Sequence, residues 1–119
     1  MGELRKYDLE DRLVKFAIII LEVCANTRAA NNLEYQLSKS GTAPALMYGE
    51  AQAAESRNDF IHKMKMFLKE LRETRISLRI INEKPVIQHE KIQTALKECN
   101  ELIGIFTKSI ETANKNKVT

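Results

Sequence analysis

The sequence predicts an all-α protein, an antiparallel up-down-up-down four-helix bundle that spans residues 1–119 as a single domain. A length of 119 residues suits one hydrophobic core. The chain has only two prolines, four glycines and no tryptophan, and it is rich in Leu, Ile, Ala, Lys and Glu, which lose little rotamer freedom in helices. Apolar residues also recur every three or four positions in four successive segments, as they do on the buried side of amphipathic helices.

The first helix is expected at about residues 9–26. Its apolar stripe consists of Leu9, Leu13, Phe16, Ala17, Ile20 and Cys24. The stripe is widened by Ile18, Ile19, Leu21 and Val23. A helix that is apolar on more than one side either lies centrally or shares its second face with another subunit. This segment therefore predicts surplus apolar surface.

The second helix is expected at about residues 29–55. It carries apolar or small residues at Leu33, Leu37, Met47, Ala51 and Ala54. Gly41 and Pro44 fall in its middle, and proline removes a backbone donor and disfavours the helical conformation in the residue before it. We therefore expect a break near residues 41–44.

The third helix is expected at about residues 57–83. Ser56, or Asn58 in its place, suits the N-cap position. The negative charge of Asp59 interacts favourably with the positive, N-terminal end of the helix dipole. Pro85 follows the expected C-terminal end of the helix. The apolar stripe of this helix consists of Phe60, Met64, Phe67, Leu68, Leu71 and Leu78.

The fourth helix is expected at about residues 87–113, where the three-and-four spacing is most regular. Its stripe consists of Ile92, Ala95, Leu96, Cys99, Leu102, Ile103, Phe106 and Ile110. The polar tail from residue 114 onward is expected to fray. The links between the four helices are short, and short links between long helices make neighbours antiparallel.

Nothing in the sequence predicts a membrane or secreted protein. The longest apolar run, Phe16 to Leu21, has six residues, whereas a membrane-spanning helix needs about 20. The N-terminus lacks the apolar region of a signal peptide and the Ser or Thr of a myristoylation signal. Cys24 and Cys99 are far apart and form no CxxC motif, so we expect two buried thiols. The expected location is the cytoplasm.

No catalytic, metal or cofactor site is predicted, and no small-molecule substrate is expected. Di-iron centres of bundles use Glu-x-x-His pairs, and neither His62 nor His89 has a glutamate three residues before it. Glu50 lies among small residues, where we expect a half-buried carboxylate with a structural role. Glu70 and Glu73 are expected to pair with Lys or Arg on the outside of the third helix. The protein is predicted not to be an enzyme.

A row of five cations on the third helix is the strongest candidate binding feature. At 100° per residue they fall within about 120° of one another, beside the apolar stripe. We call them the basic strip: Lys65, Lys69, Arg72, Arg75 and Arg79. The strip can neutralise phosphates and release counterions, although the formal charge of the chain is only +3. Alternatively, the long aliphatic stems of these residues cover a subunit boundary.

The segment of residues 36–74 resembles a known family. The resembling positions are Gln36, Ser40-Gly41-Thr42, Glu50-Ala51, Ser56, Asp59-Phe60-Ile61, Lys69-Glu70 and Glu73-Thr74. They are similar to the four helix bundle proteins, which include the 23S ribosomal RNA intervening-sequence proteins and are related to the accessory proteins of diversity-generating retroelements. The resemblance implies an up-down bundle that assembles as a homopentamer, with a second helix kinked near the Ser40-Gly41-Thr42 step. It also implies a bacterial, cytoplasmic protein and, in parts of the family, association with nucleic acid.

These observations predict a non-enzymatic homo-oligomer, with pentamer as the expected state. The first hypothesis is that the assembly binds RNA, DNA or a nucleoprotein through the basic strip on the third helix. The alternative is a protein-interaction scaffold that binds no nucleic acid and whose basic strip borders subunit contacts.

Overall fold

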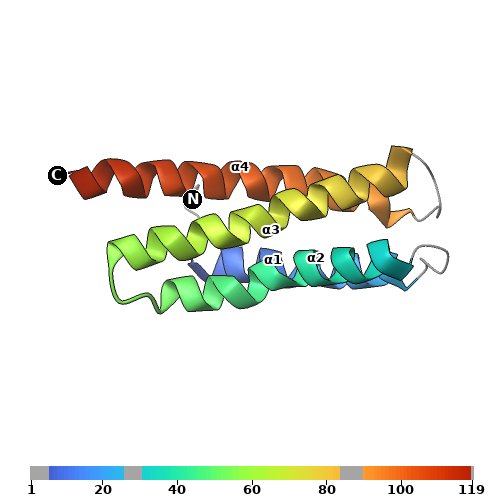
Figure 1. Ribbon diagram of the computed structural model, residues 1–119, viewed down its shortest axis with the longest axis horizontal. Coiled ribbons are helices and arrows are strands. Elements are labelled where there is room, and N and C mark those ends of the chain that lie inside the picture. The colour runs from blue at the N-terminus through green and yellow to red at the C-terminus, as the bar shows by residue number, and fades with distance from the viewer. Residues whose placement is uncertain (1–5, 26–30, 84–89, 119) are drawn as a thin grey trace.

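The computed structural model describes residues 6–25, 31–83 and 90–118. Within these ranges the chain forms four α-helices: α1 (Lys6–Cys24), α2 (Asn31–Gln52), α3 (Arg57–Glu83) and α4 (Lys91–Val118). Successive helices run in opposite directions (Figure 1). The predicted all-α, up-down-up-down four-helix bundle is confirmed.

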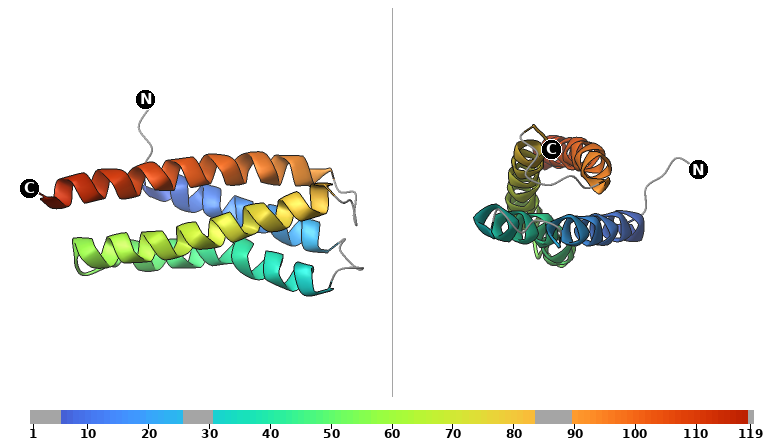
Figure 2. Two further views of the ribbon diagram at one scale, coloured as in Figure 1. Left: turned by 45° about the horizontal axis from the view of Figure 1, so that its top comes forward. Right: turned by 90° about the vertical axis from the view of Figure 1, so that its right-hand side faces the viewer.

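One hydrophobic core lies between the four helices. α2 packs extensively against α1 and α3, and α3 packs against α4, whereas the contact between α1 and α4 is smaller. The end-on view in Figure 2 shows α1 beside α2, with α3 and α4 packed over this pair. Tyr48, Phe67 and Phe106 form an aromatic cluster at the junction of α2, α3 and α4. The ring centroids of Phe67 and Phe106 are 4.6 Å apart in an edge-to-face arrangement, and that of Tyr48 is 5.7 Å from Phe106.

The helix limits agree best with prediction at α3. Its first turn has the expected cap, because the amide of Asp59 donates a hydrogen bond to Ser56 Oγ over 3.1 Å. α1 begins at Lys6, three residues before the predicted start. The predicted end at 26 and the predicted starts at 29 and 87 lie outside the described residues.

The ends of α2 and α4 differ from prediction. α2 ends at Gln52 rather than near 55. Its last turn tightens, because the amide of Ala54 bonds to the carbonyl of Ala51, and the amide of Ala53 is shared between the carbonyls of Glu50 and Gly49. α4 continues to Val118, beyond the predicted end at 113, so the expectation of a frayed tail was wrong. Lys115 lies near this end, where a positive charge interacts favourably with the negative end of the helix dipole.

The predicted break near residues 41–44 is not observed. α2 is continuous and holds Pro44 inside it. A proline within a helix costs about 3 kcal/mol. This cost is outweighed because α2 buries residues on both sides of Pro44, including Leu37 before it and Tyr48 and Ala51 after it. Continued burial therefore carries the helix past the proline.

The Ser40-Gly41-Thr42 step makes three different contacts. Ser40 Oγ and Thr74 Oγ1 of α3 share a buried hydrogen bond of 2.9 Å. Gly41 lies against Ile20 of α1, where an added Cβ would be 2.7 Å from Ile20 Cγ2. The hydroxyl of Thr42 donates to the carbonyl of Ser38 over 2.8 Å. The step therefore joins α2 to both of its neighbours.

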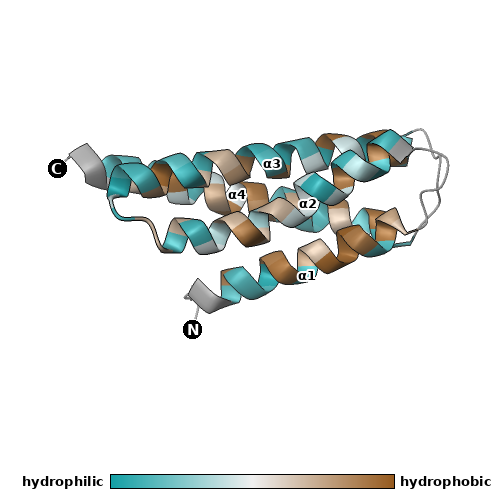
Figure 3. Ribbon diagram, turned by 60° about the horizontal axis from the view of Figure 1, so that its bottom comes forward, coloured by the Kyte–Doolittle hydropathy of each residue, from teal (hydrophilic) through white to brown (hydrophobic). Residues whose placement is uncertain are grey.

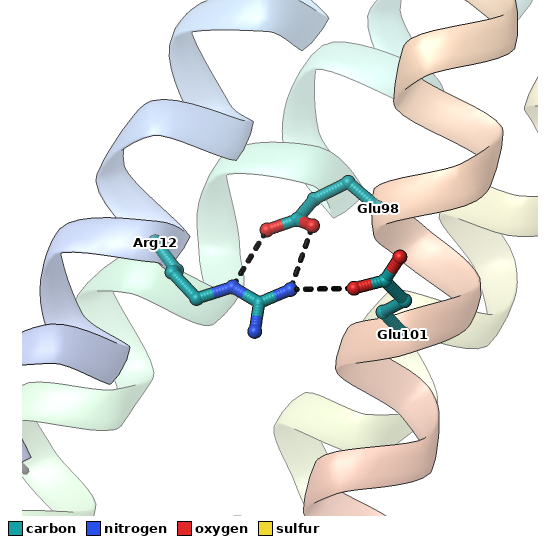
Figure 4. A network of polar contacts seen from close by, with 3 residues as sticks. All are labelled: Arg12, Glu98 and Glu101. Atoms are coloured by element: carbon teal, nitrogen blue, oxygen red, sulfur yellow. Dashed lines mark hydrogen bonds and ion pairs between the residues drawn. The ribbon is translucent and has the colours of Figure 1, made fainter. Parts of the chain in front are cut away.

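The contact between α1 and α4 is closed by ion pairs at the surface. Figure 4 shows Arg12 reaching two carboxylates of α4. Its Nε and Nη2 atoms donate to the two oxygens of Glu98 over 2.9 and 2.7 Å, and Nη2 also approaches Glu101 at 3.2 Å. The hydrogen bond with Glu98 is the main reason that the Arg12 pKa is raised. Lys91 and Glu22 form a further α1–α4 pair at 2.6 Å.

We expect Arg12→Lys to lower the free energy of unfolding by about 1 kcal/mol. The charge is kept, but a lysine cannot reproduce the two parallel bonds to Glu98. Urea unfolding at low salt measures the change. The control is Lys15→Gln, which removes an exposed pair with Asp11 and should cost less than about 0.5 kcal/mol. Equal effects of the two substitutions would contradict this account of Arg12.

Candidate interaction surface

The basic strip is divided between two grooves on opposite sides of α3. Lys65, Lys69 and Arg72 line a groove between α2 and α3. Arg75 and Arg79 line a second groove, between α3 and α4. This division follows from the position of α3, which packs against α2 on one side and α4 on the other. The five cations therefore do not share one surface environment.

The α2/α3 groove is largely apolar. Its volume is about 690 Å³, and its lining comprises Leu33, Gln36, Ser40, Lys65, Leu68, Lys69, Arg72, Glu73, Ile76, Ser77 and Ile80. Ile76 and Ile80 are each 49% exposed. No ion pair of Lys65, Lys69 or Arg72 is found among the described residues. The groove thus combines exposed isoleucines with three cations at its edge.

The α3/α4 groove is mainly polar. Its volume is about 770 Å³, and its lining comprises Arg75, Arg79, Asn82, Glu83, Gln93, Leu96, Lys97 and Asn100. Arg79 pairs with Glu83 at 2.9 Å one turn along α3. Arg75 Nη1 lies 3.5 Å from the side-chain oxygen of Asn100 on α4. Its lining thus holds three cations, one carboxylate and three amides, and the side-chain amide of Gln93 donates to Asn82 Oδ1 over 2.6 Å.

A protein-family model described as "23S rRNA-intervening sequence protein" matches residues 5–108. The chain belongs to this family. The match confirms the resemblance predicted from the sequence. Belonging to this family does not by itself assign a biochemical activity to the groove residues.

A solved structure with the same fold comes from Bacteroides thetaiotaomicron. It is described as a protein with unknown function from the S23 ribosomal protein family. The TM-score is 0.80 at 24% sequence identity, and the alignment covers 91% of this chain and 99% of the other. At this identity the likeness shows the bundle fold. The comparison with curated proteins found no match.

The carboxylates singled out from the sequence lie in different environments. Glu50 is exposed, so the expectation of a half-buried carboxylate was wrong. Its position near the end of α2 leaves it facing solvent among small residues. Glu70 is partly buried, and its pKa is raised by burial and secondarily by the charge of Glu73, against the opposing influence of Lys39 and Lys69. Glu73 lines the α2/α3 groove.

The metal and acid-base candidates do not come together in the described parts of the chain. His62 is exposed on α3, and His89 lies outside the described residues. Asp59, the acidic residue three positions before His62, contacts Lys63 at 3.7 Å. Among residues 6–25, 31–83 and 90–118, no three His, Cys, Asp or Glu side chains gather as metal ligands.

None of the described helices is long and apolar enough to cross a membrane. The cytoplasmic location remains a prediction from the sequence.

Sequence reasoning missed the two isoleucines of the α2/α3 groove. Ile76 and Ile80 lie outside the predicted core stripe, and they are half exposed. Their four-residue spacing next to the basic strip was the available signal, because it places both on one line of the helix. Lys97 was also missed, since it comes from α4 and joins Arg75 and Arg79 only in the folded bundle.

The two cysteines are buried free thiols, as predicted. The thiol of Cys99 donates to the carbonyl of Leu71 over 3.2 Å, and Cys24 contacts the carbonyl of Glu34 at 3.6 Å. Burial is the main cause that raises the Cys99 pKa to about 12 and the Cys24 pKa to about 11. They therefore help to hold α3 to α4 and α1 to α2.

We expect both thiols to resist Ellman's reagent at pH 8 until the protein unfolds. With a pKa near 12, only about one Cys99 in ten thousand is the reactive thiolate at that pH. The raised pKa values of the two thiols also contribute to the stability of the folded state. This contribution is fully present below pH 9, the ordinary pKa of a thiol, and is lost as the pH rises through 11 to 12. Measuring colour development with and without urea tests the prediction. Rapid reaction of both thiols in the native protein would contradict it.

Proposed function

We propose that this chain is a non-enzymatic scaffold protein that assembles with copies of itself, and that the α2/α3 groove is a contact surface in the assembly. The observation that carries the proposal is the groove itself, where the exposed side chains of Ile76 and Ile80 lie among three cations. An apolar centre within a charged border is the usual composition of a protein–protein contact. Burying the isoleucines in a neighbour favours association through the hydrophobic effect.

The non-enzymatic character is supported by where the candidate acid-base groups lie. Glu50 and His62 are exposed on regular helices, and neither lines the α2/α3 or the α3/α4 groove. Cys24 and Cys99 are buried thiols with raised pKa values, which makes them poor nucleophiles. A catalytic site needs such groups to converge around a substrate.

The first experiment is the mass of the purified protein by multi-angle light scattering. We expect a multiple of the 13.6 kDa chain mass, and the family resemblance predicts a pentamer, five times that mass. Lys69→Glu combined with Arg72→Glu should lower this mass, because it replaces two of the three cations at the edge of the groove with carboxylates. The matched control, Arg75→Glu with Arg79→Glu, changes the same number of charges on the α3/α4 side and should leave the mass unchanged. A monomeric wild-type protein would contradict self-assembly.

Nucleic-acid binding is a second candidate function, and the α3/α4 groove favours it. Arg75, Arg79 and Lys97 can contact phosphates, while the amides of Asn82, Gln93 and Asn100 suit the edges of bases. A modest number of contacts in each subunit gains strength when the groove is repeated around an assembly. In this proposal, the part of the basic strip that binds nucleic acid is Arg75 and Arg79.

The test for this second function is the binding of fluorescent single-stranded RNA and DNA at several salt concentrations. We expect affinity to fall as salt rises, because each contacted phosphate releases counterions. Arg75→Glu with Arg79→Glu should abolish binding while the assembly mass stays constant. Loss of binding on Lys69→Glu with Arg72→Glu, at unchanged mass, would instead assign nucleic acid to the α2/α3 side. Absorbance at 260 and 280 nm on the light-scattering peak reports nucleic acid that co-purifies.

A further inference from the structure

α1 carries an exposed apolar row on the side turned away from the core. Val14, Ile18 and Leu21 are 44%, 50% and 49% exposed, and we call them the α1 ridge. Their spacing of four and three residues places them on one line of the helix. Figure 3 looks onto α1 and shows apolar colouring along much of its length. The sequence predicted surplus apolar surface on this helix, and the ridge is where that surface lies.

The charges beside the α1 ridge are mainly negative. At 100° per residue, Glu10 lies on one side of the ridge, while Asp11 and Glu22 lie on the other. All three are exposed. The nearby cation Lys15 contacts Asp11 at 3.1 Å. Glu22 also pairs with Lys91 of α4 at 2.6 Å, so three carboxylates and two ammonium groups give this surface a net charge of −1.

The α2/α3 groove has the complementary character. Lys65, Lys69, Arg72 and Glu73 are the charged residues of its lining and give a net charge of +2. Its apolar wall includes Ile76 and Ile80 on α3 and Leu33 on α2. The exposed apolar row on α1 and the apolar groove are therefore bordered by opposite charges.

We propose that the α1 ridge of one copy docks into the α2/α3 groove of a second copy. This inference rests on the proposed self-assembly and names the occupant of the groove. α1 and α3 do not pack against each other within the described bundle, so ridge and groove are separate surfaces of the chain. The contact is therefore head-to-tail. Each copy still offers a free ridge or groove to the next, and such contacts continue until they close into a ring or extend as a filament.

Two surface substitutions test the pairing. Ile18→Asp places a charge on the ridge, and Ile76→Asp places one in the groove. Both positions are about half exposed, so the helical circular dichroism should be unchanged. Each variant alone should be a 13.6 kDa monomer, because every copy lacks one of the two matching surfaces. An equimolar mixture should form a heterodimer of twice that mass, since one variant keeps the groove and the other keeps the ridge.

The control is Leu46→Asp, which introduces a charge at an apolar position that is 73% exposed and belongs to neither surface. It should retain the wild-type mass. Variants that remain monomers when mixed would overturn the ridge-to-groove pairing. Variants that keep the wild-type mass would also overturn it, and in that case self-assembly itself would stand. A wild-type monomer, in contrast, would overturn the proposed function.

Discussion

Gly41→Ala is expected to destabilise the bundle by about 1–3 kcal/mol, although alanine is the better helix former. In a free helix this exchange stabilises by about 1 kcal/mol. Here the added Cβ would lie 2.7 Å from Cγ2 and 3.0 Å from Cβ of Ile20. These atoms belong to the base of a β-branched side chain and cannot rotate away. Relief therefore requires α1 and α2 to separate, and overpacking of this kind typically costs 1–3 kcal/mol. Urea unfolding measures the difference.

Two further glycines in α2 and α4 provide matched controls. A Cβ added at Gly49 or Gly104 meets nothing within 4 Å. Gly49→Ala and Gly104→Ala should therefore stabilise the protein by up to about 1 kcal/mol. In an Ile20→Ala background the cost of Gly41→Ala should become clearly smaller, since Cγ2 and Cγ1, at 2.7 and 2.8 Å, are removed and only the Cβ at 3.0 Å remains. An undiminished cost in that background would show that contact with the Ile20 side chain is not the cause.

Phe106→Ala should produce the largest loss of stability, about 3–5 kcal/mol. The side chain is fully buried and lies at the contact of α4 with α2 and α3. Its removal deletes the edge-to-face contact with Phe67 and the contact with Tyr48. A domain of this size has a total free energy of unfolding of about 5–15 kcal/mol, so this substitution should remove a large part of it. Thermal and urea unfolding followed by circular dichroism measure the loss.

The comparison for this position is Phe106→Leu, which keeps most of the volume. It should cost clearly less than alanine, because the cavity is smaller and only the aromatic contacts are lost. A loss below 1 kcal/mol for Phe106→Ala would mean that the three helices do not depend on this cluster for their packing.

The helices were predictable from the sequence because burial follows the periodicity of apolar residues. The predicted core residues Phe16, Phe67 and Phe106 are all fully buried. Pro44 shows where this reasoning fails. Local propensity predicts a break there, but the stability of α2 depends on residues far away in sequence that pack along both halves of the helix. Propensity alone does not include that contribution.

The candidate site was predictable only in part. Projection of α3 grouped the five cations into one strip beside the apolar stripe. It did not show which helices lie beside these cations. In the folded chain, Lys69 and Arg72 line the α2/α3 groove. Arg75 and Arg79 line the α3/α4 groove. That division depends on which helices lie beside α3, which a single-helix projection does not contain. Similarly, Ser40 and Thr74 are 34 positions apart, and their bond becomes evident only in the folded chain.

The bundle is held unevenly around its circumference. Three of the four helix contacts are extensive, whereas the α1–α4 contact is the smallest and is bridged by Arg12 and Lys91 to carboxylates. Salt screens such surface pairs but leaves apolar contacts largely unaffected. The separation of α1 from α4 is thus the local opening whose free energy should fall as ionic strength rises. Amide hydrogen exchange near this contact should accelerate with salt, while α2 and α3 remain protected as one cooperative unit.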